Sequence, residues 1–146
     1  MKKIIILGGG LVGSVIARDL QKEFFVSIAD VSIERLKFLR DKFSLNGIEA
    51  DLSNATTIKK VVKDFDLVIG AVPGFLGFTM LKAVIEAKKN IVDISFFPED
   101  ALELDKLAKK NNVTAIVDCG VAPGSSSIII GYHHAQMDED RKSTRL

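Results

Sequence analysis

A glycine-rich turn between a strand pattern and a helix pattern is the feature that most constrains the fold of this 146-residue chain. Gly8, Gly10 and Gly13 directly follow the apolar residues 4–7, and a helical pattern begins at Leu11. The first glycine of such a unit permits a tight turn, the second lets a pyrophosphate approach the backbone, and the third lets the helix pack on the sheet. Free N–H groups at the helix N-terminus attract the same anion. The segment therefore predicts a strand–turn–helix unit that binds a dinucleotide.

The second predicted strand, residues 25–30, ends in the carboxylate of Asp30. An acidic residue about 20 positions after the glycines is expected to accept hydrogen bonds from the hydroxyls of the adenosine ribose. It favours NAD over NADP, because it repels a 2′-phosphate and its neighbours Val31 and Ser32 carry no guanidinium. Arg35 lies one turn further and could soften this preference. Asp30 could also cap the next helix, a role that is compatible with ribose binding.

Apolar runs alternate with segments of helical period, which is typical of a parallel sheet covered by helices on both faces. Strands are predicted at residues 3–7, 25–30, 47–50, 67–72, 90–94 and 113–117. Helices are predicted at residues 11–22, 33–43 with Ser32 as the cap, 54–62 with Ser53 as the cap, 76–87 and 99–110. The most apolar run, residues 67–72, should be a central strand, because strands buried on both faces lose the alternation of polar and apolar residues. The fold class is α/β, a doubly wound, parallel, six-stranded Rossmann sheet in the order 3-2-1-4-5-6.

The composition of the chain limits which partners it can bind and in which cellular compartment it is expected. The chain has 20 Lys and Arg against 19 Asp and Glu, so no net field attracts nucleic acid or an anionic membrane, and neither is expected as a partner. The early uncharged stretch is interrupted by glycines, lacks a cleavage site and is too short to span a bilayer. Cys119 is the single cysteine, so no intrachain disulfide is possible and a cytoplasmic location is expected.

The last part of the chain differs from the rest. Residues 1–124 form the predicted dinucleotide-binding domain, whereas residues 125–146 form a helix with isoleucines at 128–130 and then a charged stretch without an apolar stripe. Such a helix lacks a surface to pack against. We expect that the chain stops near a domain boundary and that the natural polypeptide continues into a substrate domain.

Loops after the third and fourth predicted strands supply further candidates. Ala50 and Asp51 follow the third strand, where Rossmann domains contact the adenine, although an ordinary capping role explains Asp51 equally well. Ala71, Val72 and Pro73 follow the fourth strand beside the topological switch point of the sheet. The nicotinamide ribose could approach this small loop, although Pro73 could simply fix a turn.

Asp93 and Cys119 lie at the ends of the fifth and sixth predicted strands, on the same edge as the cofactor, so either could reach a substrate. The alternative for Cys119 is a small buried hydrophobe. His133 and His134 are adjacent on a helix and point about 100° apart, so they do not converge on one metal. No metal-ligand spacing occurs elsewhere, and no metal site is expected.

Four segments together resemble the N-terminal half of the saccharopine dehydrogenase family, which includes saccharopine reductases and lysine 6-dehydrogenases. They are residues 4–13, 66–75, 90–95 and the segment Asp118-Cys119-Gly120-Val121-Ala122-Pro123-Gly124. The first segment is generic to Rossmann domains, whereas the last, at this distance from the others, is much more specific. The resemblance covers almost the whole chain up to Gly131.

The resemblance implies NAD(P)-dependent oxidation of an amine carbon in an amino acid such as saccharopine or lysine, by hydride transfer to nicotinamide and hydrolysis of the imine. It implies that the pyrophosphate is held by Gly8, Gly10, Leu11, Val12 and Gly13, and the adenosine ribose by Asp30. It implies further that the adenine is held by Ala50 and Asp51, and the nicotinamide side by Ala71, Val72 and Pro73. Asp93 and Cys119 would border the substrate as catalytic residues. We expect a homodimeric full-length parent, and an isolated chain that binds NAD, with NADP possible, without turnover.

Two other classes of function remain open at this point. Nucleotide-sensing regulator domains of potassium transporters also combine a strand, a glycine turn, a helix and a second-strand acid, in a chain of similar length. Such a sensor has no evident use for residues 118–124 and needs no hydride-acceptor site. A third hypothesis is a domain that binds NAD only as a structural prop within an assembly.

Overall fold

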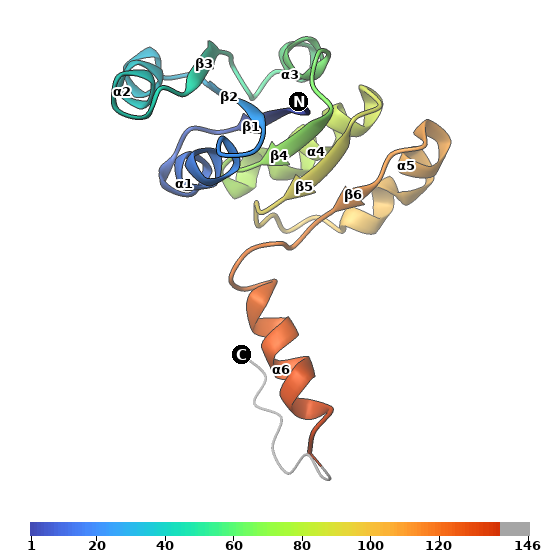
Figure 1. Ribbon diagram of the computed structural model, residues 1–146. Helices are drawn as coiled ribbons and strands as arrows, with labels where there is room; N and C mark the ends of the chain where they lie inside the picture. Colours follow the sequence, from blue (N-terminus) through green and yellow to red (C-terminus); the bar gives the residue numbers. More distant parts are fainter. Residues whose placement is uncertain (138–146) are drawn as a thin grey trace.

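The part of the chain described by the computed structural model, residues 1–137, contains a six-stranded parallel sheet in the order β3-β2-β1-β4-β5-β6 (Figure 1). The strands are β1 (Lys3–Leu7), β2 (Phe25–Asp30), β3 (Asn46–Glu49), β4 (Leu67–Gly70), β5 (Asn90–Asp93) and β6 (Ala115–Ile116). The helices are α1 (Leu11–Leu20), α2 (Ile33–Phe43), α3 (Ala55–Val62), α4 (Gly74–Glu86), the 3-10 turn η1 (Ala101–Leu104), α5 (Asp105–Asn111) and α6 (Ser125–His134). The predicted fold class and strand order are both confirmed.

Strand β1 explains why the sheet is covered on both faces. Ile5 and Leu7 join a buried cluster with α3 and α4, whereas Ile4 and Ile6 join a second cluster with α1 and α2. Successive side chains of a strand point to opposite faces, so an unbroken apolar run needs a core on each side. Full burial of each such side chain contributes about 1.5–3 kcal/mol to folding. Strand β4 lies between β1 and β5, as its apolar sequence predicts.

The ends of several elements differ from the prediction. The fourth strand ends at Gly70 instead of residue 72, and the following helix begins at Gly74 instead of residue 76. The helix predicted over residues 99–110 divides into η1 and α5. Strand pairing rather than hydropathy sets the end of β4, because its pairing with β1 and β5 stops at Gly70 and a residue belongs to a strand only while a partner strand lies beside it.

The predicted cap of α3 is wrong by one residue. Asn54, not Ser53, occupies the cap, and its Oδ1 accepts hydrogen bonds from the N–H groups of Thr56 at 2.9 Å and Thr57 at 3.1 Å. Ser53 instead donates from its hydroxyl to Asp51 at 2.6 Å. Both residue types make good caps, and the turn at Asp51 decides which one reaches the helix N-terminus.

We expect Asn54→Ala to lower the free energy of unfolding by about 1 kcal/mol, because two N–H groups lose their acceptor. The matched change Ser53→Ala removes one exposed hydrogen bond and should change it by less than about 0.5 kcal/mol. Urea denaturation of both variants measures the difference. A larger loss for Ser53→Ala than for Asn54→Ala would contradict the assignment of the cap.

Parallel strands bring all their carboxyl ends to one edge, and this edge positions the candidate residues. The turn after β1, the end of β2 and the loops after β4 and β5 therefore lie together, although they are far apart in the sequence (Figure 1). Strand order reverses between β1 and β4, and open sheets of this kind bind ligands at the crevice that the reversal creates.

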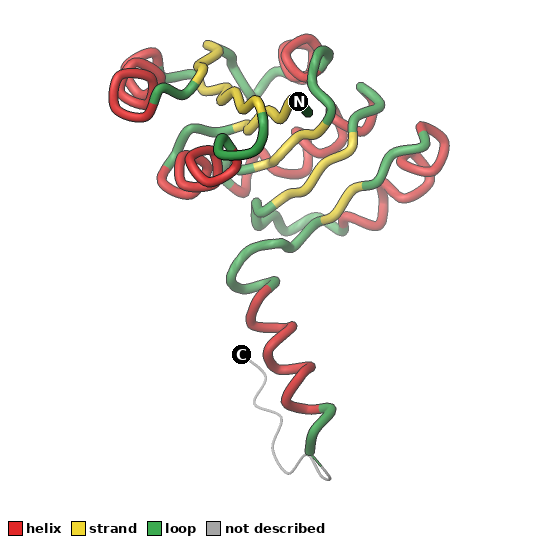
Figure 2. Tube along the Cα trace, viewed as in Figure 1, coloured by secondary structure: helices red, strands yellow, loops and turns green. Residues whose placement is uncertain are grey.

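Helix α6 stands apart from this arrangement. A loop separates it from β6, and the helix extends away from the sheet (Figure 2). None of its residues is buried, and Ile128, Ile129 and Ile130 are 74%, 57% and 64% exposed. Residues 138–146 of the predicted charged stretch lie outside the described residues. Within residues 1–137, no helix has the length and apolar character needed to cross a membrane.

Candidate functional site

The glycine turn after β1 is shaped by two backbone contacts. Gly8 has a φ of 110°, a conformation that favours glycine, and a Cβ there would overlap the carbonyl oxygen of Ala71. A Cβ on Gly13 would overlap the carbonyl oxygen of Gly8. These two glycines let α1 pack directly on the ends of β1 and β4, as the spacing predicts.

Gly10 has a different role, because an added Cβ would meet no atom within 4 Å. Its backbone is extended, with a φ of −63°, and it precedes α1 without any side-chain cap. The first N–H groups of α1, on Leu11, Val12 and Gly13, therefore face no capping side chain. An uncapped helix N-terminus beside an open backbone position is suited to bind a phosphate.

Asp30, at the end of β2, holds the turn through hydrogen bonds. Its Oδ2 accepts from the N–H of Gly9 at 2.6 Å, and its Oδ1 accepts from the N–H of Ser32 at 2.8 Å. The cap of α2 is Ser32, whose hydroxyl oxygen accepts from the N–H of Arg35. The alternative of Asp30 as the helix cap is therefore wrong, and its carboxylate keeps lone pairs for a further ligand.

Arg35 contacts the same turn from α2. Its Nε donates to the carbonyl oxygen of Gly9 at 2.6 Å, and its Nη2 lies 3.3 Å from the carbonyl oxygen of Gly10 and 3.1 Å from Ser14 Oγ. Gly9 is thus held through its N–H by Asp30 and through its carbonyl by Arg35. Sequence reasoning missed this contact, because nothing in the local pattern of α2 indicates a partner 26 residues away.

A groove of about 490 Å³ brings most of the predicted cofactor residues together. Its lining comprises Gly8, Gly10, Leu11, Val12, Gly13, Asp30, Ala71, Val72, Pro73, Ile94, Ser95 and Phe96. The glycine turn lies between the Asp30 end and the end formed by residues 94–96. Sequence reasoning did not include Ser95 and Phe96 in the cofactor site, although they directly follow the predicted strand of residues 90–94.

A second hollow of about 290 Å³ shares Asp30 and Pro73 with this groove and is lined also by Asp51, Leu52 and Phe75. Asp51 accepts hydrogen bonds from the hydroxyl and the N–H of Ser53, which hold the pKa of its carboxyl below the ordinary value. Ala50 is buried and is not part of the lining of this hollow. The adenine roles of Ala50 and Asp51 stay predictions.

Asp93 is fully buried at the end of β5. Its Oδ2 accepts from the hydroxyl of Ser95 at 2.6 Å, and its Oδ1 would overlap a Cβ on Gly70. Burial raises the pKa of the Asp93 carboxyl to about 6, with a smaller contribution from the charge of Asp118, while the hydrogen bonds from Ser95 oppose the shift. Ser95 is 5% exposed and is the member of this pair that lines the groove. The catalytic role of Asp93 stays a prediction.

Cys119 lies beyond β6 with an exposed side chain, so the alternative of a buried hydrophobe is wrong. Its N–H donates to the carbonyl oxygen of Asp93 at 3.2 Å, which ties the loop to the end of β5. Cys119 lines neither the groove nor the second hollow, and its catalytic role also stays a prediction. His133 and His134 lie on α6, and residues 1–137 contain no cluster of three or more potential metal ligands.

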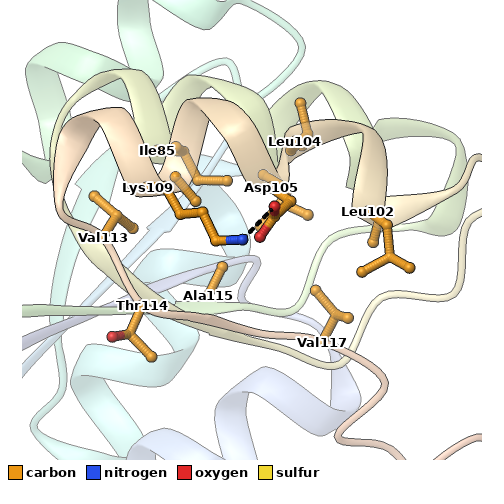
Figure 3. A pocket seen from close by; sticks show the side chains of 12 residues that line it. Ile85, Leu102, Leu104, Asp105, Lys109, Val113, Thr114, Ala115 and Val117 are labelled. Atoms are coloured by element: carbon orange, nitrogen blue, oxygen red, sulfur yellow. Dashed lines mark hydrogen bonds and ion pairs between the residues drawn. The ribbon is translucent and has the colours of Figure 1, made fainter.

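Another hollow, of about 340 Å³, lies away from the glycine turn, between η1, α5 and β6 (Figure 3). Its walls are mainly apolar, and Lys109 is paired there with Asp105 at 2.8 Å. The hollow contains none of the predicted site residues.

The fold, the glycine turn and the groove define a dinucleotide-binding domain of the Rossmann type. Residues 4–116 match the family model described as the saccharopine dehydrogenase NADP binding domain. The chain belongs to this family and is an NAD(P)-binding domain of the saccharopine dehydrogenase type.

Individual proteins of known sequence or structure also resemble the chain. The chain is 25% identical to mouse alpha-aminoadipic semialdehyde synthase, mitochondrial, over 84% of its length and 14% of that protein. It is 31% identical to alanine dehydrogenase of Methanococcus maripaludis over 77% of its length and 32% of that protein. The apo structure of saccharopine dehydrogenase (L-Glu forming) from Saccharomyces cerevisiae superposes with a TM-score of 0.76 and 23% identity, over 93% of this chain and 32% of that one. The chain spans about a third or less of the length of these proteins, and they lend no support to a potassium-transporter regulator.

The residues of the groove fit the nicotinamide dinucleotide that the family implies. Because Gly10 has no Cβ, the position where a Cβ would stand is open, and the uncapped start of α1 lies beside it. Asp30 keeps acceptor capacity at one end of the groove, and small or apolar residues line the loop after β4. A negatively charged pyrophosphate can therefore approach the backbone without displacing a side chain.

We expect Gly10→Val to reduce the affinity for NADH at least tenfold, because the new side chain occupies the groove. The free energy of unfolding should fall by no more than about 1 kcal/mol, which is the usual cost of a poorer N-cap residue, since the added Cβ itself meets no protein atom within 4 Å. Gly13→Ala is the matched contrast and should destabilise the fold by about 1–3 kcal/mol, because its Cβ overlaps the Gly8 carbonyl. Calorimetric titration and urea denaturation measure the two quantities, and unchanged affinity in Gly10→Val would contradict the assigned phosphate position.

The raised pKa of Asp93 predicts how stability depends on pH. The native carboxyl binds its proton up to about pH 6, whereas the unfolded one loses it near the ordinary value of 3.8. This group therefore contributes stability that is fully present below about pH 3.8 and is lost as the pH rises to about 6. The loss is at most about 3 kcal/mol.

Asp93→Asn should remove this dependence, so the variant gains stability relative to wild type between pH 4.5 and 7.5 in urea denaturation. Asp66→Asn is the control, and its effect on stability relative to wild type should have the opposite sign as the pH rises. The reason is that a hydrogen bond from the Lys3 N–H lowers the pKa of the Asp66 carboxyl. Parallel stability profiles for wild type and Asp93→Asn would show that Asp93 does not titrate in this range.

Proposed function

We propose that this chain is the cofactor-binding part of an NAD(P)-dependent oxidoreductase that acts on the CH–NH or CH–NH2 carbon of an amino acid such as saccharopine or lysine. The groove over the glycine turn, with Asp30 at one end, is the observation that carries the cofactor role. The substrate class rests on kinship, because the relatives' names include saccharopine dehydrogenase, alpha-aminoadipic semialdehyde synthase and alanine dehydrogenase.

In this proposal each part of the groove binds one part of the cofactor. The first N–H groups of α1 hold the pyrophosphate, Asp30 accepts from the adenosine ribose, and the hollow beside Asp51 takes the adenine. Residues 71–73 and 94–96 enclose the nicotinamide half. When bound, the cofactor would accept the hydride that leaves the amine carbon, while the amine nitrogen would release a proton to water. The oxidised substrate is an imine, which water then hydrolyses.

Asp93 and Cys119 border the substrate in this proposal. The loop carrying Cys119 is tied to Asp93 by a backbone hydrogen bond, so the two residues keep a fixed relation at one edge of the sheet. The buried Asp93 holds a proton near pH 6 and orients Ser95, which lines the groove. We further propose a homodimeric parent protein and a cytoplasmic location, the latter from the single cysteine.

The isolated 146-residue chain should bind NADH without completing the reaction, because it spans about a third or less of the length of its relatives. Calorimetric titration with NADH and NADPH measures binding, and NADH formation from NAD with saccharopine, lysine or alanine measures turnover. Gly10→Val serves as the binding-deficient control.

Absence of binding at millimolar cofactor would contradict the proposed cofactor role. Amine-dependent NADH formation by the isolated chain would instead contradict the proposal that it binds without turnover. A regulatory or purely structural domain is supported only if the parent protein also fails to oxidise these amino acids while it retains cofactor binding.

A further inference from the structure

Strand β6 forms one edge of the sheet, and within residues 1–137 no strand pairs with its outer side. On its inner side the Thr114 carbonyl accepts from the Ile91 N–H at 3.1 Å, and the Thr114 N–H donates to Asn90 Oδ1 at 2.8 Å. The backbone groups of successive strand residues point alternately to the two sides of the strand. The N–H groups of Ala115 and Val117 therefore point away from β5, to the open edge.

The side chains beside this edge leave apolar surface on both faces of the sheet. Ala115 and Val117 line the hollow of about 340 Å³ between η1, α5 and β6, here called the edge hollow (Figure 3). Leu102 lines the same hollow and is 77% exposed. Ile116 points to the opposite face, because strand side chains alternate, and it is 50% exposed. A strand added beside β6 would place alternate side chains in the edge hollow and over Ile116.

The two edges of the sheet differ in charge. The hollow beside β3, at the other edge, is lined by the charged side chains of Lys37, Arg40 and Glu49. In the edge hollow the charges of Asp105 and Lys109 pair with each other at 2.8 Å, and the other lining residues are apolar apart from Thr114. Charged side chains are a common protection of edge strands against pairing. The β3 edge has this protection, whereas the β6 edge is suited to a partner.

We infer that the open edge of β6 and the edge hollow bind an extended apolar segment of the parent polypeptide, which adds a seventh strand to the sheet. Carbonyl groups of the segment accept from the N–H groups of Ala115 and Val117. One apolar side chain enters the hollow beside Leu102, and the next covers Ile116. The inference rests on the proposed function only in that the chain is part of a longer protein, and it does not involve the cofactor groove.

The geometry of the edge favours a segment of the parent over a separate partner. Strand β6 has two residues, so few backbone hydrogen bonds are available to hold a free peptide. A segment of the same polypeptide is present at an effective concentration on the order of millimolar. The chain covers 14% of the mouse relative and 32% of the yeast structure, so most of each lies outside it.

A second copy of the chain fits this edge less well. Helix α5 lies above β6 across the edge hollow, so a second copy paired there would bring its own α5 to the same face (Figure 3). Paired strands lie about 4.8 Å apart, whereas packed helices need about 8–10 Å between their axes. An extended segment has no helix to accommodate.

Hydrogen–deuterium exchange of the Ala115 and Val117 amides tests the inference by comparing the isolated 146-residue chain with the parent protein. Both amides should exchange at least about tenfold more slowly in the parent, because a hydrogen-bonded amide exchanges only when the structure opens locally. The rates should not depend on the concentration of either protein, since the segment belongs to the same polypeptide.

Leu102→Asp tests whether the edge hollow holds the segment. In the parent it should raise the exchange rate of both amides at least about tenfold, because a charge would lie against the added strand. In the isolated chain it should leave the rates unchanged, since Leu102 is already exposed there. Ile33→Asp is the matched control, because Ile33 is 47% exposed and lines the hollow beside β3. It should leave the exchange of Ala115 and Val117 unchanged in both proteins.

Leu102→Ala provides a milder change and should raise the two rates in the parent to a smaller extent. Exchange of the Ile5 and Val68 amides, in the central strands β1 and β4, shows that each variant remains folded.

Three results overturn the inference. The first is equal exchange of Ala115 and Val117 in the parent and the isolated chain. The second is protection that increases with protein concentration, which would assign the edge to a second copy. The third is protection in the parent that both Leu102 variants leave intact. Failure of the proposed cofactor role gives a different result, because neither protein then binds NADH while the difference in exchange persists.

Discussion

The close contact between the backbone of Gly13 and the carbonyl of Gly8 is the interaction on which the rest of the site depends. No side chain separates helix α1 from the end of β1, so the N-terminus of the helix is placed directly at the carboxyl edge of the sheet. Gly8 in turn lies against the carbonyl of Ala71, which joins the turn to the end of β4. A larger residue at either position would move α1 away from the edge and remove its N–H groups from the groove. Gly10 is free to face a ligand because these two contacts fix the turn around it.

The buried pair formed by Asp93 and Ser95 shows how the sheet accommodates polar groups near the site. Space for the carboxylate exists because β4 presents Gly70 opposite it, and a Cβ on Gly77 of α4 would lie 2.6 Å from Ser95 Oγ. Gly70 and Gly77 are therefore needed because they leave space for the Asp93 and Ser95 side chains, not because the backbone turns there. A buried carboxyl is costly when ionised; hydrogen bonds from Ser95 reduce that cost, and the remaining cost raises the pKa of the carboxyl to about 6. A buried carboxyl with a raised pKa at a strand end beside the groove is typical of a functional site, and the proposed function places Asp93 beside the substrate.

The charged side chains beside the glycine turn bear on the cofactor preference. A second-strand carboxylate by itself favours NAD, whereas the family to which the chain belongs is described by NADP binding. Asp30 accepts from the Gly9 N–H and Arg35 donates to the Gly9 carbonyl, so a negative and a positive side chain both hold this residue of the turn. The fold determines where the cofactor lies, but the substrate class depends on kinship, since Rossmann domains serve many substrates.

The sequence by itself determined the sheet order, the glycine turn, Asp30 and the family, because these depend on local spacing and on apolar runs that must be buried on both faces. It also placed the loops after β4 and β5 at the cofactor edge, since parallel strands bring all their carboxyl ends together. It could not determine that Asn54 rather than Ser53 caps α3, or that Arg35 holds Gly9. Nor could it show that Asp93 is buried against Ser95 while Cys119 is exposed. These features depend on which side chains from distant segments meet, and only the tertiary structure decides that, because packing sets distances that spacing along the chain does not.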